Sequence, residues 1–146
     1  MMVSTIRALV VEDSATMRAF VVAALEHEGF EVTQARSGFE ALKILPKERF
    51  HFIVTDVNMP DINGLELVRY VRNSADHKAT PLIIISTDGR ERDRERGMQL
   101  GATAYLVKPF KPEELVKKVR EVLTPGTNVA PQMASPTSTT QPPIKK

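Results

Sequence analysis

The chain has 146 residues, a length that suits one domain with a single hydrophobic core, and its 42% hydrophobic and 26% charged content is ordinary for a globular protein. No apolar run approaches the roughly 20 residues of a membrane span, and the absence of cysteine excludes disulfides, thiolate nucleophiles and Cys-ligated metal sites. The net charge of +2 resides in the last two lysines, so the remainder is formally neutral and binding of nucleic acid is not expected.

The two ends of the sequence carry little structural signal. The start, MMVSTIRALVVED, lacks the apolar region and cleavage site of a signal peptide, so we expect a cytoplasmic protein. Residues 124–146 hold five of the ten prolines and have no periodic apolar pattern. We expect a folded domain over residues 1–123 and a disordered Pro/Ser/Thr-rich tail over 124–146 that acts as a solvated spacer.

Between the ends, short apolar clusters alternate with amphipathic segments. The clusters predict strands at 6–11, 30–35, 50–55, 81–86 and 104–108. Helical periodicity or capping signals predict helices at 14–28, from the SGFE box at 37–40, at 64–75, through the charged run 89–97, and after Pro112. Nearly all-apolar strands that alternate with helices predict a doubly wound α/β domain, with a parallel sheet covered on both faces.

Polar and charged residues lie at the carboxyl ends of four of the five predicted strands. They are Glu12 and Asp13, Asp56, Ser86 and Thr87, and Lys108 followed by Pro109. In an open parallel sheet, ligands bind beyond the carboxyl ends of the strands, so we expect these residues to form one site. A single carboxylate at such a position is more often a helix cap or a solvated charge, but that explanation weakens for four strands together.

The chemistry of this set favours phosphoryl transfer with a metal ion. Three neighbouring carboxylates repel one another unless cations lie among them, and Lys108 supplies only one positive charge. Oxygen ligands from Asp13 and Asp56, with a backbone carbonyl and waters, suit Mg²⁺. A carboxylate beside Mg²⁺ can attack phosphorus to form an acyl phosphate, so Asp56 is the predicted nucleophile. The Ser86 hydroxyl would donate to a phosphoryl oxygen.

Four motifs resemble those of the receiver domains of two-component response regulators, of the single-domain chemotaxis (CheY-like) type. They are VVEDS (10–14), TDVNMPDINGLEL (55–67), IISTD (84–88) and YLVKPF (105–110), and the resemblance runs from about Ile6 to Leu123. It implies a flavodoxin-like fold of five βα units with strand order 2-1-3-4-5.

The resemblance also implies roles for the residues of the predicted site. Asp56 matches the phosphoacceptor, and Glu12 with Asp13 matches the acidic pair that holds Mg²⁺. Asn58 matches the residue whose backbone carbonyl binds the metal, and its side chain occupies a position that tunes hydrolysis. Lys108 matches the lysine that contacts the phosphoryl group.

A second group of positions matches the switching apparatus of the family. Ser86 matches the switch hydroxyl and Tyr105 the aromatic residue that turns inward after phosphorylation. Thr87 lies where its branched side chain would narrow access to the phosphoacceptor, and Asp88 lies at a second position that tunes hydrolysis. Pro109 matches the residue that follows a cis peptide bond at Lys108.

The resemblance further implies the partners of the protein. A histidine kinase or phosphotransfer protein would donate the phosphoryl group, and a downstream protein would bind the face of the fourth helix, fifth strand and fifth helix. Such a protein catalyses only its own phosphorylation and dephosphorylation, and is expected to be a monomer or weak dimer. With no output domain expected, it would act by docking, and the arginines of the run 89–97, otherwise a solvated surface, could select an acidic partner.

Two other interpretations remain open from the residues alone. A phosphatase of the haloacid dehalogenase type also places an Asp at a strand end, but it needs a second carboxylate two residues later, where this chain has Asn58. A protein-binding module could use the same face without phosphorylation. The three histidines, at positions 27, 51 and 77, lack the spacing of metal ligands and are expected to be surface or packing residues.

Overall fold

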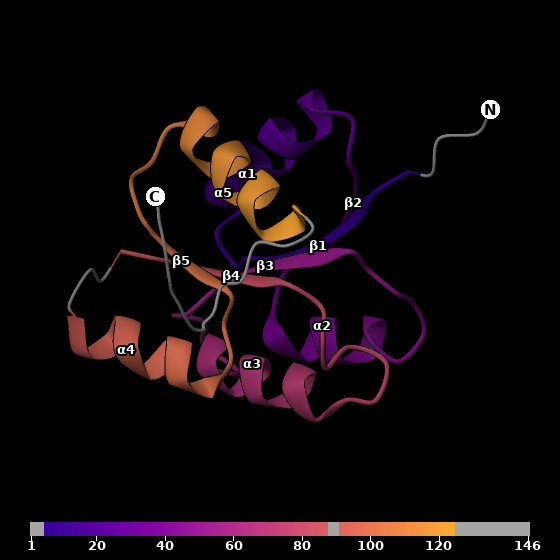
Figure 1. Cartoon of the computed structure of the whole chain (residues 1–146), viewed down its shortest axis with the longest axis vertical. Helices are drawn as coiled ribbons and strands as arrows, with labels where there is room; N and C mark the ends of the chain where they lie inside the picture. The colour runs from indigo at the N-terminus through magenta and orange to yellow at the C-terminus, as the bar shows by residue number, and fades with distance from the viewer. Residues whose placement is uncertain (1–4, 88–90, 125–146) are drawn as a thin grey trace, which may run out of the picture.

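The computed structural model describes residues 5–87 and 91–124, in which strands and helices alternate along the chain (Figure 1). The strands are β1 (Arg7–Val11), β2 (Glu31–Ala35), β3 (Phe52–Asp56), β4 (Leu82–Ser86) and β5 (Ala104–Val107). The helices are α1 (Ala15–His27), α2 (Gly38–Ile44), α3 (Gly64–Asn73), α4 (Glu91–Leu100) and α5 (Pro112–Leu123). The predicted doubly wound α/β fold is confirmed.

The five strands form one parallel sheet in the order β2-β1-β3-β4-β5, as the resemblance implied. Strand boundaries differ from the prediction by one or two residues. The strand predicted at 50–55 begins at Phe52 and ends on Asp56, and the strand predicted to reach Lys108 ends at Val107. Asp56 is therefore part of β3, where hydrogen bonds to neighbouring strands hold its backbone.

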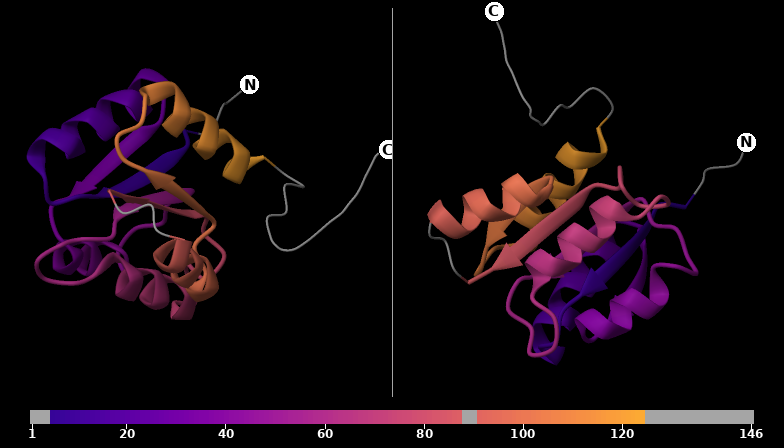
Figure 2. Two further views of the ribbon diagram at one scale, coloured as in Figure 1. Left: turned by 90° about the vertical axis from the view of Figure 1, so that its left-hand side faces the viewer. Right: turned by 90° about the horizontal axis from the view of Figure 1, so that it is seen from below.

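Helices cover both faces of the sheet (Figures 1 and 2). Helices α1 and α5 lie side by side on one face, where they pack on strand residues such as Val10, Val54 and Ile83. Helices α2, α3 and α4 lie on the other face, over residues such as Leu9 and Ile53. Successive strand residues point to opposite faces, and helices cover both faces. The inner strands β1, β3 and β4 are therefore apolar along most of their length, whereas the edge strand β2 is not.

Local capping signals define several helix ends. The Ser14 and Ser37 hydroxyls accept hydrogen bonds from the backbone of Met17 and Glu40 at the starts of α1 and α2. Gly29 and Gly101 follow the ends of α1 and α4 with positive φ angles of 92° and 117°, a conformation that glycine adopts readily.

The expectations on membrane spans, the C-terminal tail and the charged run 89–97 concern residues that are described only in part. Within residues 5–87 and 91–124, none of the helices combines the length and apolar character of a membrane-spanning segment. The predicted tail from residue 125 onward lies outside the described residues, as do Gly89 and Arg90 of the charged run. The described part of that run lies in α4, where Arg94, Glu95 and Arg96 are exposed.

Candidate functional site

The sheet brings the carboxyl ends of β1, β3, β4 and β5 to one edge. Asp56 pairs with Ile85 and Ser86 pairs with Val107, so these strands end nearly in step. Glu12 and Asp13 follow β1 directly. Ligand oxygens of Glu12, Asp13 and Asp56 lie within 4.8 Å of one another, in the predicted cluster of three carboxylates.

Lys108 lies across this cluster. Its Nζ is 3.1 Å from Glu12 Oε1 and 3.3 Å from Asp56 Oδ1, and 11% of its side chain is exposed. The backbone N–H of Lys108 donates to the Ser86 carbonyl at 2.7 Å, which fixes the lysine to the end of β4. One ammonium group thus serves two of the three carboxylates, and the cluster retains net negative charge.

Burial makes this charge unfavourable. Asp56 is 4% exposed and Glu12 is 1% exposed. Loss of solvent raises the pKa of Asp56, the positive charge of Lys108 opposes that rise, and the nearby Asp13 adds to it. Loss of solvent likewise raises the pKa of Glu12, although a hydrogen bond from the Ser14 backbone and the charge of Lys108 oppose it. A divalent cation at this position would relieve both effects.

The backbone around Asp56 is held by a close approach of α3. Gly64 begins α3, and its N–H donates to the Val57 carbonyl at 2.8 Å. A Cβ atom at Gly64 would overlap the Asp56 carbonyl oxygen and lie 2.8 Å from Val57 Cα. Only glycine fits here without a shift of the backbone that carries Asp56. No local sequence pattern around Gly64 signals this requirement.

The turn after β1 positions Glu12. The Ser14 N–H donates to Glu12 Oε2 at 3.0 Å, and Arg18 Nη1 donates to the Glu12 carbonyl at 2.9 Å. Arg18 Nε also donates to Gln34 Oε1 at 3.2 Å, which connects α1 with β2. Glu12 therefore has a fixed backbone and a fixed carboxylate, while Asp13 is exposed at the mouth of the site.

Asp61 ties the loop after β3 to the start of α2, a contact that the sequence analysis also missed. Its carboxylate accepts hydrogen bonds from the backbone of Gly38 (3.2 Å), Phe39 (2.9 Å) and Ile62 (2.7 Å). Partial burial raises the pKa of Asp61, but the hydrogen bonds from these three N–H groups outweigh burial and lower the pKa. The Asp-Ile-Asn sequence after Pro60 signals a turn, but not a partner 22 residues earlier in the chain.

The remaining residues of the predicted site are distributed around the cluster. Ser86 is buried at the end of β4, whereas Asn58 and Thr87 are exposed. Tyr105 is 8% exposed and belongs to the core cluster beneath α3 and α4. The Lys108–Pro109 peptide bond is cis. Asp88 lies outside the described residues.

The histidines take no part in this site. His77 is buried, and its Nε2 lies 2.8 Å from the Leu45 carbonyl oxygen, while His27 and His51 are exposed.

The donor set fits a hard divalent cation. Three carboxylates at short mutual distances supply oxygen ligands of the kind that Mg²⁺ prefers, and Asp13 is open to solvent, so waters can complete the coordination. The neutral and sulfur ligands that favour zinc or copper are not part of the cluster.

Comparison with known proteins places this geometry in a family. The profile of the response regulator receiver domain matches residues 8–120. Chemotaxis protein CheY1 of Helicobacter pylori is 40% identical over 122 residues, which cover 82% of this chain and 97% of that protein. The chain spans about half the length of another relative, a probable transcriptional regulatory protein of Picosynechococcus, at 37% identity and with 80% of this chain covered.

Solved structures agree with the sequence comparison. The chemotaxis response regulator CheY4 of Vibrio cholerae has a TM-score of 0.79 and 40% identity, with coverage of 82% of this chain and all of that one. The receiver domain of the sensor histidine kinase PA1611 of Pseudomonas aeruginosa has a TM-score of 0.76 and 28% identity, and covers 82% of this chain and 98% of that one. That structure holds a magnesium ion coordinated in its active site cleft.

Proposed function

Because the chain belongs to the response regulator receiver family and is a CheY-like receiver of two-component signalling, we propose that it accepts a phosphoryl group on Asp56 in a Mg²⁺-dependent reaction. The observation that carries the proposal is the cluster of three carboxylates at the sheet edge, of which the two buried ones, Glu12 and Asp56, both contact Lys108. Within residues 5–87 and 91–124, no other group of three acidic or histidine side chains lies close enough to share a metal ion.

Asp56 acts as the nucleophile in this proposal. A carboxylate oxygen of Asp56 attacks the phosphorus of the donor, a new O–P bond forms, and the bond to the leaving group breaks with its electron pair. This step requires the attacking oxygen to be held in a fixed position. Asp56 meets the requirement because it is the last residue of the central strand β3. The product is an acyl phosphate with added negative charge in a site that is already negative.

Two kinds of positive charge stabilise that product. Mg²⁺, when bound by Asp13, Asp56, the Asn58 carbonyl and, through water, Glu12, would neutralise charge on the phosphoryl oxygens. Lys108 already contacts Asp56 Oδ1 at 3.3 Å, so a small movement of its ammonium group would bring it to a phosphoryl oxygen. Ser86 ends the adjacent strand, and its hydroxyl would donate to another phosphoryl oxygen.

We propose that phosphorylation shifts the population of states on the neighbouring surface. Movement of Ser86 toward the phosphoryl group would leave space that Tyr105 fills, since both residues lie on adjacent strands β4 and β5. The side chains of Asn58 and Asp88 would tune the rate at which the acyl phosphate is hydrolysed, and Thr87 would limit access to Asp56. A histidine kinase or phosphotransfer protein would be the donor.

The face of α4, β5 and α5 is the proposed output surface. A hollow of about 290 Å³ lies there, and Arg94, Met98, Tyr105 and Lys118 are among the residues that line it. Met98 and Val107, on α4 and β5, are each 41% exposed. Exposed apolar groups beside Arg94 and Lys118 favour a protein partner that offers both apolar and acidic side chains.

Incubation of the purified protein with acetyl phosphate and Mg²⁺ tests the proposal. We expect one phosphoryl group per chain on the wild type, none on the Asp56→Asn variant, and normal labelling of the control Asp76→Asn, which changes an exposed acid far from the site. Release of phosphate over many turnovers without a retained acyl phosphate would indicate a phosphatase. Absence of any labelling on the wild type would indicate a binding module. Either result would contradict the proposal.

A further inference from the structure

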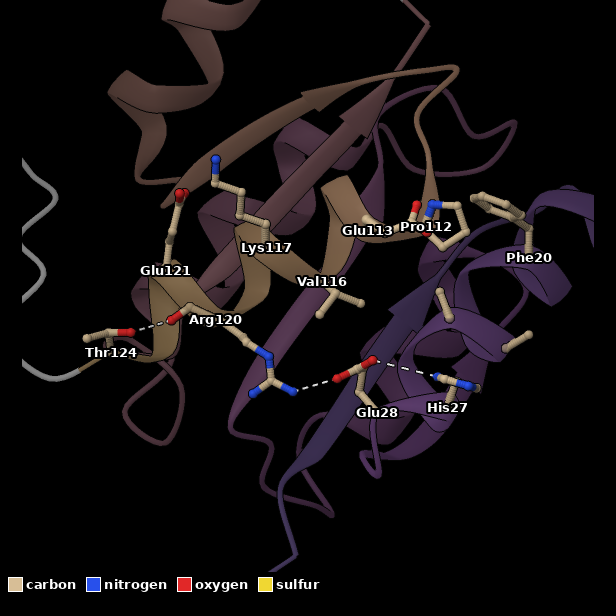
Figure 3. Close-up of a pocket in the computed structure, with 12 residues that line it drawn as sticks. Phe20, His27, Glu28, Pro112, Glu113, Val116, Lys117, Arg120, Glu121 and Thr124 are labelled. Atoms are coloured by element: carbon tan, nitrogen blue, oxygen red, sulfur yellow. Dashed lines mark hydrogen bonds and ion pairs between the residues drawn. The ribbon is translucent and has the colours of Figure 1, made fainter.

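A second hollow lies between α1 and α5, outside the phosphorylation site (Figure 3). It has a volume of about 840 Å³. Phe20 and Pro112 lie at one end, and His27, Glu28 and Thr124 lie at the other (Figure 3). We call this hollow the α1–α5 groove. It runs along both helices and is open to solvent on the side away from the sheet.

The floor of the groove is apolar and its rim is charged. Phe20, Ala23 and Val116 line it, and the Phe20 ring packs against the Phe110 ring at a centroid distance of 5.8 Å. On the rim, Arg120 Nη2 lies 2.6 Å from Glu28 Oε1, and Glu28 Oε2 lies 3.6 Å from His27 Nδ1 (Figure 3). Because Arg120 and Glu28 already pair with each other and the floor is apolar, the groove favours an uncharged apolar chain.

The sequence that follows α5 provides such a chain. Thr124 is both the last described residue and part of the groove wall, and its hydroxyl donates to the Arg120 carbonyl at 2.6 Å. The next residues read Pro-Gly-Thr, so Thr124–Thr127 has the signature of a type II turn, with proline and glycine at its two central positions. A turn of this type would direct the following residues back along α5.

The segment after this turn has the composition that the groove requires. Residues 128–136, NVAPQMASP, contain no charged side chain. Val129, Pro131 and Met133 occupy alternate positions, which point to the same side of an extended chain. The four steps from Val129 to Met133 span roughly 13 Å in an extended chain. They fit within the length of about 18 Å expected for the 12 residues of α5.

We propose that residues 128–136 of this chain bind in the α1–α5 groove, with Val129 and Met133 against Phe20, Ala23 and Val116. The proposal goes beyond the phosphorylation reaction and replaces the role of solvated spacer that composition alone suggested. The bound segment would cover α1 and one side of α5. Partners that need those helices would then compete with the protein's own C-terminal segment.

A second copy of the chain fits the groove less well. A symmetric contact through this face would set one hollow against another and leave both apolar floors uncovered. It would also bring the charged rims, already paired within each copy, against each other without new partners. The covalently attached segment has the further advantage of high effective concentration, since only a short turn separates it from the groove wall.

Paramagnetic relaxation measured on the full chain tests the proposal. The chain has no cysteine, so Ser135→Cys gives a single attachment site for a nitroxide label. We expect loss of amide signal intensity at Ala23 and Lys117 along the groove, and no loss at Tyr70, which lies on α3 across the sheet. The pattern should persist when labelled chain is diluted with unlabelled chain.

Two matched variants of the labelled chain decide the outcome. Replacement of both Val129 and Met133 by Ser keeps the segment length but removes its apolar groups, and Ala23→Glu places a charge at an exposed position on the groove wall. Each should restore the signals of the groove amides. The same loss of amide signal intensity in the parent labelled chain and in both variants would overturn the proposal, because the segment would then move without docking. Signal loss that occurs only between chains, in a mixture of labelled and isotope-enriched protein, would assign the groove to a second copy.

Discussion

Asp56 carries a charge that the metal-free protein does not stabilise fully. It ends a buried strand, contacts one ammonium group and lies beside two other carboxylates. This arrangement suits a residue whose purpose is to receive a cation and a phosphoryl group, because the unfavourable charge in the free state becomes a favourable one when the cation is present.

The stability of the Asp56→Asn variant tests whether the charge of Asp56 destabilises the fold when no cation is bound. Burial raises the folded-state pKa of Asp56, so the protonated form stabilises the fold. That stabilisation is complete below the unfolded-state pKa, which is about 3.9, and is lost as pH rises through the higher folded-state pKa. Without divalent cations, the variant should therefore exceed the wild type in free energy of unfolding at neutral pH, by on the order of 1 kcal/mol.

Chemical denaturation in EDTA across the acid range provides the measurement. The difference between the two proteins should shrink as pH falls toward the unfolded-state pKa. Asp76→Asn, which changes an exposed acid paired with Arg49, should show no comparable gain. A variant that is less stable than the wild type at neutral pH would show that the Asp56 charge is already compensated.

At the scale of elements, Arg72 fastens α3 to two neighbouring loops. Its guanidinium donates to the Gly101 carbonyl (2.7 Å), the Thr80 carbonyl (2.7 Å) and the Thr103 hydroxyl (3.3 Å). These loops lead into β4 and β5, the strands that end in Ser86 and precede Lys108. Arg72 thus fixes the amino ends of β4 and β5, the two strands that position Ser86 and Lys108 at the site.

Replacement of Arg72 by Met keeps the length of the side chain but leaves several backbone carbonyls without donors. We expect a loss of roughly 2 kcal/mol in the free energy of unfolding. Arg69→Met, at an exposed position on the same helix, should change stability by less than about 0.5 kcal/mol. Urea denaturation of both variants gives the comparison, and equal stability of the two would show that the Arg72 bonds are replaceable by water.

The start of α3 leaves no space for a side chain at position 64. Gly64→Ala forces a Cβ atom against the Asp56 carbonyl and Val57 Cα, so α3 or the end of β3 must move. We expect a loss of roughly 1–3 kcal/mol in stability and a lower rate of phosphorylation by acetyl phosphate. Glu66→Ala, an exposed change in the same first turn, should affect neither. A normal rate for Gly64→Ala would show that the position of Asp56 is less constrained than the packing indicates.

For the molecule as a whole, cation binding and folding should be coupled. The carboxylates that would hold Mg²⁺ come from β1 and β3 and assemble only in the folded chain. A ligand at one hundred times its dissociation constant stabilises a protein by about 2.7 kcal/mol. We therefore expect Mg²⁺ to raise the melting temperature of the wild type, as calorimetry would show.

The Asp13→Asn variant is the control for this coupling. Asp13 is exposed, so its loss should leave the fold intact while weakening the response to Mg²⁺. The same ionic strength of a monovalent salt should not reproduce the effect on the wild type. An equal rise in melting temperature for both proteins would mean that Mg²⁺ acts elsewhere on the surface.

The fold followed from the sequence because its signals are local and repeated. Apolar runs of five residues, capping residues such as Ser14 and Ser37, and the alternation of strands and helices are each visible within a short window. The meeting of Glu12, Asp56 and Lys108 also followed, since parallel strands bring their carboxyl ends to one edge. The roles assigned to these residues stay predictions.

The remaining features depend on contacts between distant segments. Asp61 caps a helix 22 residues earlier, Arg72 reaches carbonyls as far as Gly101, and Gly64 is required by the backbone of Asp56. Each residue type has many ordinary roles, so its partner cannot be read from spacing alone. The α1–α5 groove likewise exists only once two helices from opposite ends of the domain lie side by side.

Chemical identification of the phosphorylated residue shows whether Asp56 is the phosphoacceptor. Borohydride reduces an aspartyl phosphate to homoserine, so treatment of the acetyl phosphate-labelled protein, followed by peptide mass mapping, locates the acceptor. We predict homoserine at position 56, formed only when Mg²⁺ is present during labelling and absent from the Asp13→Asn variant. Homoserine at another position, or at position 56 without any divalent cation, would contradict the account.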